Sequence, residues 1–257
     1  RQQPRDPVDP VLNLLTGSTR DVSVTFTEAT NMAAAPSPDG ERIAFTAQGA
    51  LWIVAASGGT ATRISNWNVE PTAPVWSPDG SLIAFQTYTT GGNYHLWTIA
   101  PDGSDPVELT TGYYDDREPA WTPDGRTLVF ASDRSNDGQY KIWGYEIASG
   151  RYFPLTKGPG AESNPVVSPD GSQIAFVDTG KVYTAPFSGT AAPTLVGDGL
   201  APQWKPDGSG LLYQATSRSL TTGGEPFASG EDLFPFPVRF LSDGRFLYTA
   251  DGKLKLR

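Results

Sequence analysis

A short alternating pattern of apolar residues recurs six times along the chain. In each copy two large apolar residues flank a third, and the flanking pairs are Ile43 and Phe45, Ile83 and Phe85, Leu128 and Phe130, Ile174 and Phe176, Leu211 and Tyr213, and Phe246 and Tyr248. Alternate residues of a strand lie on one face, so each pair predicts a strand with a large apolar face. A single sheet cannot bury such a face alone, and the pattern therefore predicts sheets stacked on one another.

The same turn precedes each of these strands. Five copies have the form Ser/Thr/Lys-Pro-Asp-Gly and a sixth reads Leu241-Ser242-Asp243-Gly244, with the aspartates at Asp39, Asp79, Asp124, Asp170, Asp207 and Asp243. Proline presets φ near −65°, aspartate bonds the local backbone, and glycine supplies the positive φ that closes a hairpin. The spacing of about 40 residues is that of a four-stranded propeller blade.

The remaining strands follow the same period. An inner strand precedes most turns (Pro74-Val75-Trp76, Pro119-Ala120-Trp121, Pro165-Val166-Val167, Pro202-Gln203-Trp204). A third strand follows in Leu51-Trp52-Ile53, Leu96 to Ile99, Ile142-Trp143 and Val182-Tyr183, and a fourth ends in Arg63-Ile64-Ser65, Glu108-Leu109-Thr110, Pro154-Leu155-Thr156 and Leu195-Val196. The segment from Ala215 to Phe236 shows no clear strands and predicts either an irregular blade or a loop over one mouth of the ring.

These elements predict an all-β fold, a six-bladed β-propeller of four-stranded antiparallel blades. The last blade lacks an outer strand, and Val22 to Phe26 alternates well without a blade of its own. We expect this N-terminal strand to close the ring, which would remove exposed sheet edges. Residues 1–20 are then an N-terminal arm or linker, and residues 21–257 are the propeller.

Composition excludes several kinds of site. The net charge of −9 disfavours nucleic acid and anionic membranes as partners, although acidity is commonly only a solubility feature. No apolar run reaches the length of a membrane span, so no membrane insertion is expected. The chain has no cysteine and a single histidine, His95, which excludes disulfides, Cys nucleophiles and zinc sites of the His₃ or Cys/His type. We expect His95 to be a structural strand residue, and we assign no catalytic or metal-ligating residue.

Polar residues gather in the segments that lead into the inner strands. These segments should meet at one mouth of the central channel, and their candidate ligand- or cation-binding residues are Asn31, Glu70, Tyr113, Tyr114, Asp115, Asp116, Glu118, Glu162 and Asn164. Converging oxygens would bind Ca²⁺ or a basic group, and a carboxylate pair would suit acid–base catalysis. Solvated loops held by local hydrogen bonds are the other interpretation. The tyrosines suit carbohydrate or peptide recognition, or packing, and Asp133-Arg134 is expected to form a local ion pair that braces its blade.

The repeat unit resembles the TolB-like (WD-repeat-like) propeller family. The resemblance rests on Pro-x-Trp-Ser-Pro-Asp-Gly-x-x-Ile-Ala-Phe, with Leu-Trp or Ile-Trp downstream and Leu-Thr at the end, as in residues 74–85, 96–97 and 109–110. Residues 24–32 and 248–253 also look like the propeller that precedes a metal-dependent amidohydrolase domain in large secreted bacterial proteins. In that family the chain continues into the hydrolase, whose metal ligands have no counterparts in these 257 residues.

Three functions are compatible with these patterns. The first is a non-catalytic propeller module of a larger amidohydrolase-like hydrolase, whose partner is the catalytic domain or chain and which gates or orients substrate. The second is a free-standing TolB-like periplasmic scaffold that binds a protein partner. The third is a propeller enzyme that uses the acidic channel-mouth loops. We expect a periplasmic or extracellular location, no cofactor within this chain except Ca²⁺ at the channel mouth, and no catalysis by this chain alone.

Overall fold

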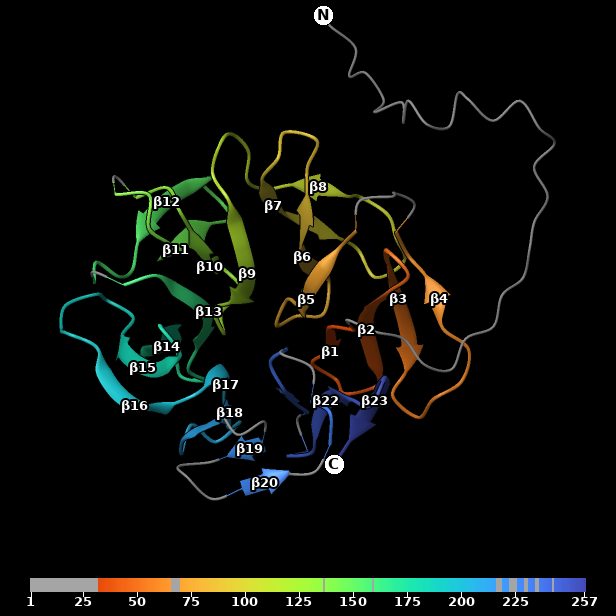
Figure 1. Ribbon diagram of the computed structural model, residues 1–257. Coiled ribbons are helices and arrows are strands. Elements are labelled where there is room, and N and C mark those ends of the chain that lie inside the picture. The colour runs from red at the N-terminus through yellow and green to blue at the C-terminus, as the bar shows by residue number, and fades with distance from the viewer. Residues whose placement is uncertain are drawn as a thin grey trace, which may run out of the picture.

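The structure is a computed structural model that describes residues 32–65, 70–135, 137–158, 160–215, 219–221, 226–228, 231–233, 236–241 and 243–257. These residues form six antiparallel sheets around a central axis (Figure 1). The all-β, six-bladed propeller predicted from the repeat is confirmed. Within the described ranges no helix is long and apolar enough to cross a membrane.

Each blade runs from an inner strand at the axis to an outer strand at the rim. Blade 1 contains β1 (Ala34–Pro36), β2 (Arg42–Ala47), β3 (Ala50–Ala55) and β4 (Thr62–Arg63). Blade 2 contains β5 (Thr72–Trp76), β6 (Ile83–Tyr88), β7 (Tyr94–Ile99) and β8 (Val107–Glu108). Blade 3 contains β9 (Asp116–Trp121), β10 (Thr127–Ser132), β11 (Lys141–Glu146) and β12 (Arg151–Pro154).

The second half of the ring has the same plan. Blade 4 contains β13 (Glu162–Val167), β14 (Gln173–Asp178), β15 (Lys181–Pro186) and β16 (Thr194–Asp198). Blade 5 contains β17 (Leu200–Trp204), β18 (Leu211–Ala215), β19 (Ser219–Thr221) and β20 (Pro226–Ala228), so part of the segment without clear strand pattern completes a blade. In blade 6 the described strands are β21 (Arg239–Phe240), β22 (Phe246–Ala250) and β23 (Lys253–Leu256).

The core consists of six apolar layers, one between each pair of neighbouring blades. The flanking pair of each second strand packs against the middle residue of the second strand in the preceding blade. Ile83 and Phe85, for example, pack on Ala44, and both are fully buried. The same arrangement recurs at the other interfaces within the ring. The apolar face predicted for each strand is therefore the surface on which the next blade stacks.

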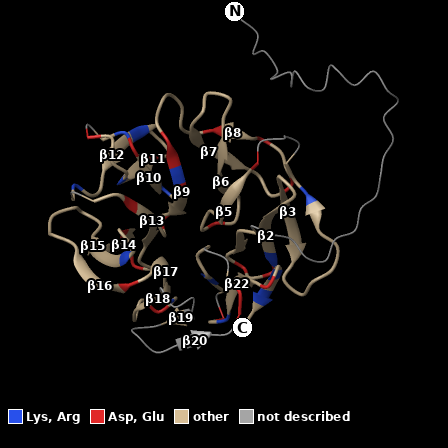
Figure 2. Ribbon diagram, in the orientation of Figure 1, with Lys and Arg blue, Asp and Glu red and all other residues tan. Residues whose placement is uncertain are grey.

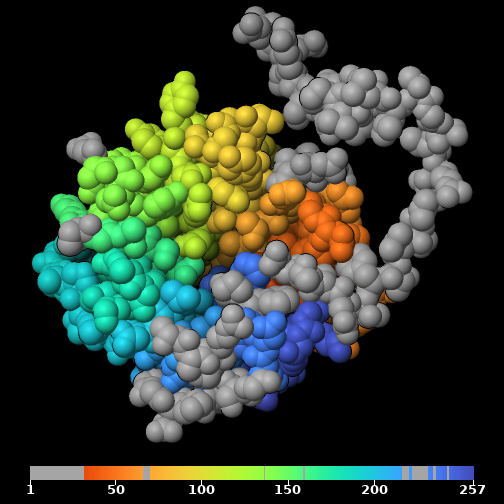
Figure 3. Space-filling model, in the orientation of Figure 1, coloured from red at the N-terminus to blue at the C-terminus, as the bar shows by residue number. Residues whose placement is uncertain are grey.

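The ring is closed by the contact between blade 6 and blade 1. Ile43 and Phe45 pack against Leu247 of β22, and Leu254 and Leu256 of β23 lie against the same cluster. Figure 3 shows the first and last blades side by side. The N-terminal strand that we expect at Val22 to Phe26 lies outside the described residues, as does the predicted arm of residues 1–20.

The repeated turns form as the sequence predicts. In all six, the aspartate Oδ1 accepts a hydrogen bond from the backbone N–H two residues later, and the following glycine has a positive φ. In four of the turns, a serine or threonine hydroxyl also donates to that aspartate. These bonds hold the pKa of the turn aspartates below their usual range, to about 2 for Asp170. Each turn therefore fixes the hairpin from the inner strand to the second strand.

Candidate ligand site in the central channel

The inner strands of blades 2 to 5 share a bulge at the channel wall. Four residues there have a positive φ, and each precedes a proline: Ala73, Glu118, Asn164 and Ala201, with φ between 49° and 59°. The ladder to the second strand shifts register at the same place in each blade. Because proline has no N–H to donate, the strand loses no ladder bond there. A non-glycine residue at positive φ costs on the order of 1–3 kcal/mol, so each of these four blades stores strain at the channel wall.

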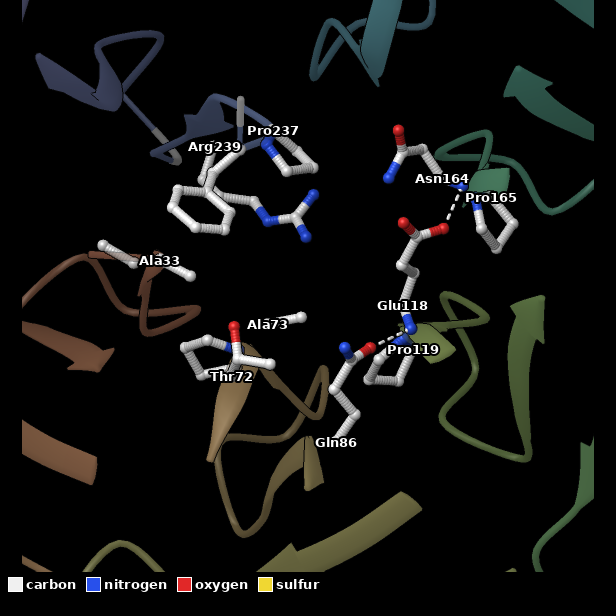
Figure 4. Close-up of a pocket in the computed structure, with 13 residues that line it drawn as sticks. Ala33, Thr72, Ala73, Gln86, Glu118, Pro119, Asn164, Pro165, Pro237 and Arg239 are labelled. Carbon is white, nitrogen blue, oxygen red and sulfur yellow. Dashed lines mark hydrogen bonds between the residues drawn. The ribbon is translucent and has the colours of Figure 1, made fainter. Parts of the chain in front are cut away.

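The bulge is a property of the fold, but the side chain that it carries differs between blades. Alanine occupies the bulge in blades 2 and 5, so the backbone conformation does not require a polar group. Glutamate and asparagine occupy it in blades 3 and 4, and both side chains line a cavity on the axis (Figure 4). Bulges commonly re-aim a side chain next to a functional site. Here they aim a carboxylate and an amide into the channel.

The cavity has a volume of about 120 Å³ and a wall of alanine and proline residues with a few polar groups. Its polar side chains are those of Thr72, Gln86, Glu118, Asn164 and Arg239. Figure 4 shows the guanidinium of Arg239 on one side of the cavity and the Glu118 carboxylate on the other. A mainly apolar wall with a few convergent polar groups is the usual form of a small-ligand site.

Hydrogen bonds tie Glu118 to the neighbouring blades. Its backbone N–H donates to Oε1 of Gln86 at 2.5 Å, and the N–H of Asn164 donates to its Oε2 at 2.5 Å. Burial raises the pKa of Glu118, and the Asn164 hydrogen bond opposes that rise. A titratable carboxyl with a raised pKa thus faces the cavity on the axis.

Arg239 lies between two cavities on the axis. It lines the 120 Å³ cavity and also a wider one of about 340 Å³ on the side of the Pro-Asp-Gly turns. Its Nη1 donates to Oε1 of Gln203 at 2.8 Å, while its Nε is buried without a hydrogen-bond partner. Within the described residues it forms no ion pair. Burial lowers the pKa of Arg239 to about 10, so the group stays charged at neutral pH.

Comparison with known proteins identifies the fold family. The TolB beta propeller domain family matches residues 18–221. The chain belongs to this family. A local match to the tricorn protease homolog 1 of Streptomyces coelicolor has 41% identity over 56 residues, which is 22% of this chain and 5% of that protein.

Solved structures agree on the fold of this TolB-type propeller. The tricorn protease superposes with a TM-score of 0.66 and 17% identity, covering 90% of this chain and 25% of the tricorn chain. TolB from Acinetobacter baumannii superposes with a TM-score of 0.62 and 21% identity, covering 88% of this chain and 53% of that chain. The propeller therefore spans about half or less of these relatives, and the similarity to them is one of fold.

Of the residues predicted at the channel mouth, the TolB-type propeller brings Glu118 and Asn164 together in the cavity. Glu70 is exposed at a positive φ of 42°, and its side chain lies near Gly49 of the neighbouring blade. Tyr113 is 93% exposed, whereas Tyr114 lies beside the guanidinium of Arg134. Asn31 lies outside the described residues.

The other predicted carboxylates are bound within the propeller wall. Asp115 accepts hydrogen bonds from the backbone N–H of Tyr94, the hydroxyl of Tyr140 and the guanidinium of Arg117, at 2.6 to 2.7 Å. These bonds hold the pKa of Asp115 below its usual range against the effect of burial. Glu162 is buried and accepts from Thr156 and from the N–H of Ile142, and burial raises its pKa.

Asp116 forms a buried ion pair with Arg134 inside blade 3. Both carboxylate oxygens accept from Nη2 of Arg134, at 2.6 and 2.7 Å. Figure 2 shows acidic and basic residues next to each other on β9. The predicted ion pair between Asp133 and Arg134 is wrong, because Arg134 pairs with Asp116. Asp133 instead accepts a hydrogen bond from the backbone N–H of Asp115 at 2.9 Å. The brace of the blade is therefore Asp116–Arg134.

His95 bridges two strands, as expected of a structural residue. Its Nδ1 lies 2.7 Å from Oε1 of Glu108 on β8, and its Nε2 lies 3.2 Å from the carbonyl oxygen of Gly112. The described ranges contain no group of three or more His, Asp or Glu residues placed to hold a metal ion. The Ca²⁺ site at the mouth remains a prediction.

Sequence reasoning missed Arg239 although the repeat contains the signal. The strand ladders align this residue with Ala35, Val75, Ala120, Val166 and Gln203, since each pairs with the middle residue of its second strand. An arginine at a position that holds small or neutral residues in five other blades stands out once the blades are aligned. The sixth turn lacks the proline of the other five, so the sixth repeat is hard to align from the sequence alone.

Proposed function

We propose that this TolB-type propeller is the non-catalytic module of a larger hydrolase. In this proposal it holds the catalytic part and admits or orients a substrate segment at its central channel. The observation that carries the proposal is the cavity on the axis, where Glu118, Asn164 and Arg239 converge in a wall of alanine and proline. Such a cavity suits recognition of a small group or chain end, and fold alone does not supply it.

The comparisons support a place within a larger protein. The match to the tricorn protease homolog and the superposition on the tricorn protease both cover only part of those chains. The ends of the sequence resemble a propeller joined to an amidohydrolase. A protease and an amidohydrolase share the cleavage of amide-type bonds, so we propose an amide-bond hydrolase as the larger protein. The resemblance to secreted proteins adds the proposal of a periplasmic or extracellular location.

The acid–base alternative has less support from the channel. A propeller enzyme of that kind needs two carboxylates around one substrate. Asp115 and Asp116 are hydrogen bonded within blade 3, which leaves Glu118 as the carboxylate that lines the described cavity. The free-standing scaffold has the support of the TolB superposition and is the second candidate.

Native mass spectrometry of the protein isolated from its own host separates the two candidates. We expect a mass well above 27.5 kDa, from a longer chain or a tightly bound second chain, together with hydrolysis of peptide or cyclic amide substrates. A single species near 27.5 kDa without such activity would overturn the hydrolase-module proposal. A complex with a partner that lacks hydrolase activity would favour the scaffold.

A further inference from the structure

We propose that Arg239 binds the carboxylate of a ligand whose apolar remainder lies in the wider cavity on the turn side of the channel. This inference rests on the proposed function and deepens it, because it states which chemical group the channel would recognise. The ligand class is a short apolar chain that ends in a carboxylate, either the C-terminus of a peptide or a free carboxylic acid.

The first argument is the missing counter-charge of Arg239. Arg239 is partly buried as a whole residue and its Nε is fully buried, and a charge withdrawn from water is costly unless it is paired and hydrogen bonded. Of its five N–H donors, one is bonded to Gln203, and no carboxylate of the described residues lies within ion-pair distance. Glu118 lines the same cavity, but its carboxylate accepts the N–H of Asn164 instead. A ligand carboxylate would supply the charge that the described residues do not.

The second argument is that the fold does not require this arginine. Five blades close the same part of the inner ring with alanine, valine or glutamine, at Ala35, Val75, Ala120, Val166 and Gln203. Blade 6 has the same strand register there, with Arg239 opposite Leu247. The cost of a partly buried cation in one blade alone therefore needs an explanation other than packing.

The third argument is the orientation of the guanidinium. Figure 4 shows its terminal nitrogens directed into the channel, between the Pro237 side and the Glu118 side. Gln203 accepts from Nη1 and so helps to hold the planar group in place. A planar guanidinium matches a carboxylate through two parallel hydrogen bonds, which an ammonium cannot form.

The fourth argument concerns which anion fits. The Glu118 carboxyl on the opposite wall and the net charge of −9 both disfavour a dianionic phosphate. The wider cavity beyond Arg239 is lined by Trp76, Trp204 and Phe240. These aromatic residues offer an apolar surface to the remainder of the ligand. A monoanionic carboxylate with an apolar chain satisfies both regions.

Binding of matched peptides to the 257-residue chain tests the proposal. The probes are N-acetyl-Ala-Ala-Leu with a free C-terminus, the same peptide as its C-terminal amide, and butyrate. Titrations followed by nuclear magnetic resonance detect weak binding. We expect the acid to bind at least about tenfold more tightly than the amide. Binding of butyrate as tight as that of the peptide acid would identify a free carboxylic acid as the source of the group, and tighter peptide binding would identify a chain end.

Variants locate the binding to the channel. Arg239→Met removes the charge with little change in length, and Arg126→Met makes the same change at an arginine whose side chain is 85% exposed on a turn. We expect at least a tenfold loss of acid binding in R239M, a smaller loss in R239K and none in R126M. Equal binding of acid and amide, undiminished binding by R239M, or no saturable binding of either carboxylate would overturn the proposal.

The test holds even if R239M does not fold. The comparison of acid with amide uses the unmodified chain, and R239K keeps the charge while losing the planar fork. The result is also independent of the mass measurement above. A large native mass with no carboxylate binding would refute the role of Arg239 and leave the hydrolase-module proposal in place. Carboxylate binding by a lone 27.5 kDa species would support the role of Arg239 and overturn the hydrolase-module proposal.

Discussion

Asp116→Asn tests how far blade 3 depends on its internal ion pair. Asp116 is 0% exposed, and both of its oxygens accept hydrogen bonds from Arg134, whose side chain is 9% exposed. The guanidinium lies 4.0 Å from the centre of the Tyr152 ring and also donates to the hydroxyl of Ser132. Asparagine keeps the shape and one acceptor oxygen but leaves the buried guanidinium without a counter-charge.

The expected loss of stability is large. Removing one partner of a buried ion pair costs about 3–5 kcal/mol, chiefly because the remaining charge stays buried and unpaired. Since one acceptor oxygen remains, we expect the lower end, about 3 kcal/mol, out of a total stability of about 5–15 kcal/mol. For a chain of this size that loss lowers the melting temperature by about 6 to 12 °C.

The matched control is Asp243→Asn at an exposed pair. Asp243 lies 2.7 Å from Nε of Arg245, and both side chains are about half exposed. Exposed pairs contribute about 0–1 kcal/mol, so D243N should lie within that range of the unmodified chain. The stability of both variants is measured by thermal and urea unfolding, followed by circular dichroism at one pH and salt concentration. The slope of the unfolding free energy against urea concentration reports any change in the surface exposed on unfolding.

The double variant D116N/R134M tests whether the unpaired charge of Arg134 causes the loss of stability in D116N. If the unpaired charge is the cause, removal of that charge should restore part of the stability lost in D116N. A D116N variant within about 1 kcal/mol of the unmodified chain, or no more affected than D243N, would refute the assignment of Asp116–Arg134 as the brace of this blade.

Three further predictions concern single groups. Burial raises the pKa of Glu118, so the charged carboxyl lowers stability as pH rises from its ordinary value of 4.5 through the raised one. We expect E118Q to be more stable than the unmodified chain at pH 8 and equal to it near pH 4, and a constant gap across that range in thermal unfolding would contradict this. Carboxyl titration by nuclear magnetic resonance should give Asp170 a pKa of about 2, and Ser168→Ala should raise that pKa. The stability that this hydrogen-bonded carboxylate contributes is lost as pH falls from 3.8 through 2. Titration of Asp170 near 3.8 would refute the turn geometry. Phe176→Ala should cost about 3–5 kcal/mol in urea unfolding because Phe176 is buried between blades 3 and 4, whereas exposed Leu195→Ala should stay within about 0.5 kcal/mol; similar losses in both would argue against this packing.

The fold was predictable because its repeated residues have the same role in every blade. The flanking pair of each second strand always packs on the preceding blade, and the turn aspartate always bonds the backbone two residues later. The strands β19 and β20 were missed because the segment from Ala215 to Phe236, in which they lie, is rich in Thr, Gly and Ser. Their strand conformation comes with pairing to β18 and to each other rather than from an intrinsic pattern.

The site was predictable only in part, because strand alternation fails at the bulge. In a regular strand Asp116 and Glu118 would share one face. The positive φ of Glu118 and the register shift beside it break this alternation, so Glu118 faces the channel while Asp116 faces Arg134 within the blade. A sequence shows carboxylates at similar distances before each turn but does not show which of them the bulge turns toward the axis.

Arg134 and Arg239 are both partly buried charges that break the repeat, and comparing them shows which kind of break points to a ligand. Arg134 lies in blade 3 and Arg239 in blade 6, and most other blades have no equivalent charge at either position. Rarity within the repeat therefore does not distinguish the two arginines. The charge of Arg134 is neutralised by Asp116 and held over Tyr152, which accounts for it as a brace. Among the described residues, Arg239 has one neutral partner, Gln203, and it faces a cavity. A partly buried charge that the described residues leave unpaired costs stability, and a bound ligand that supplies the counter-charge would offset that cost.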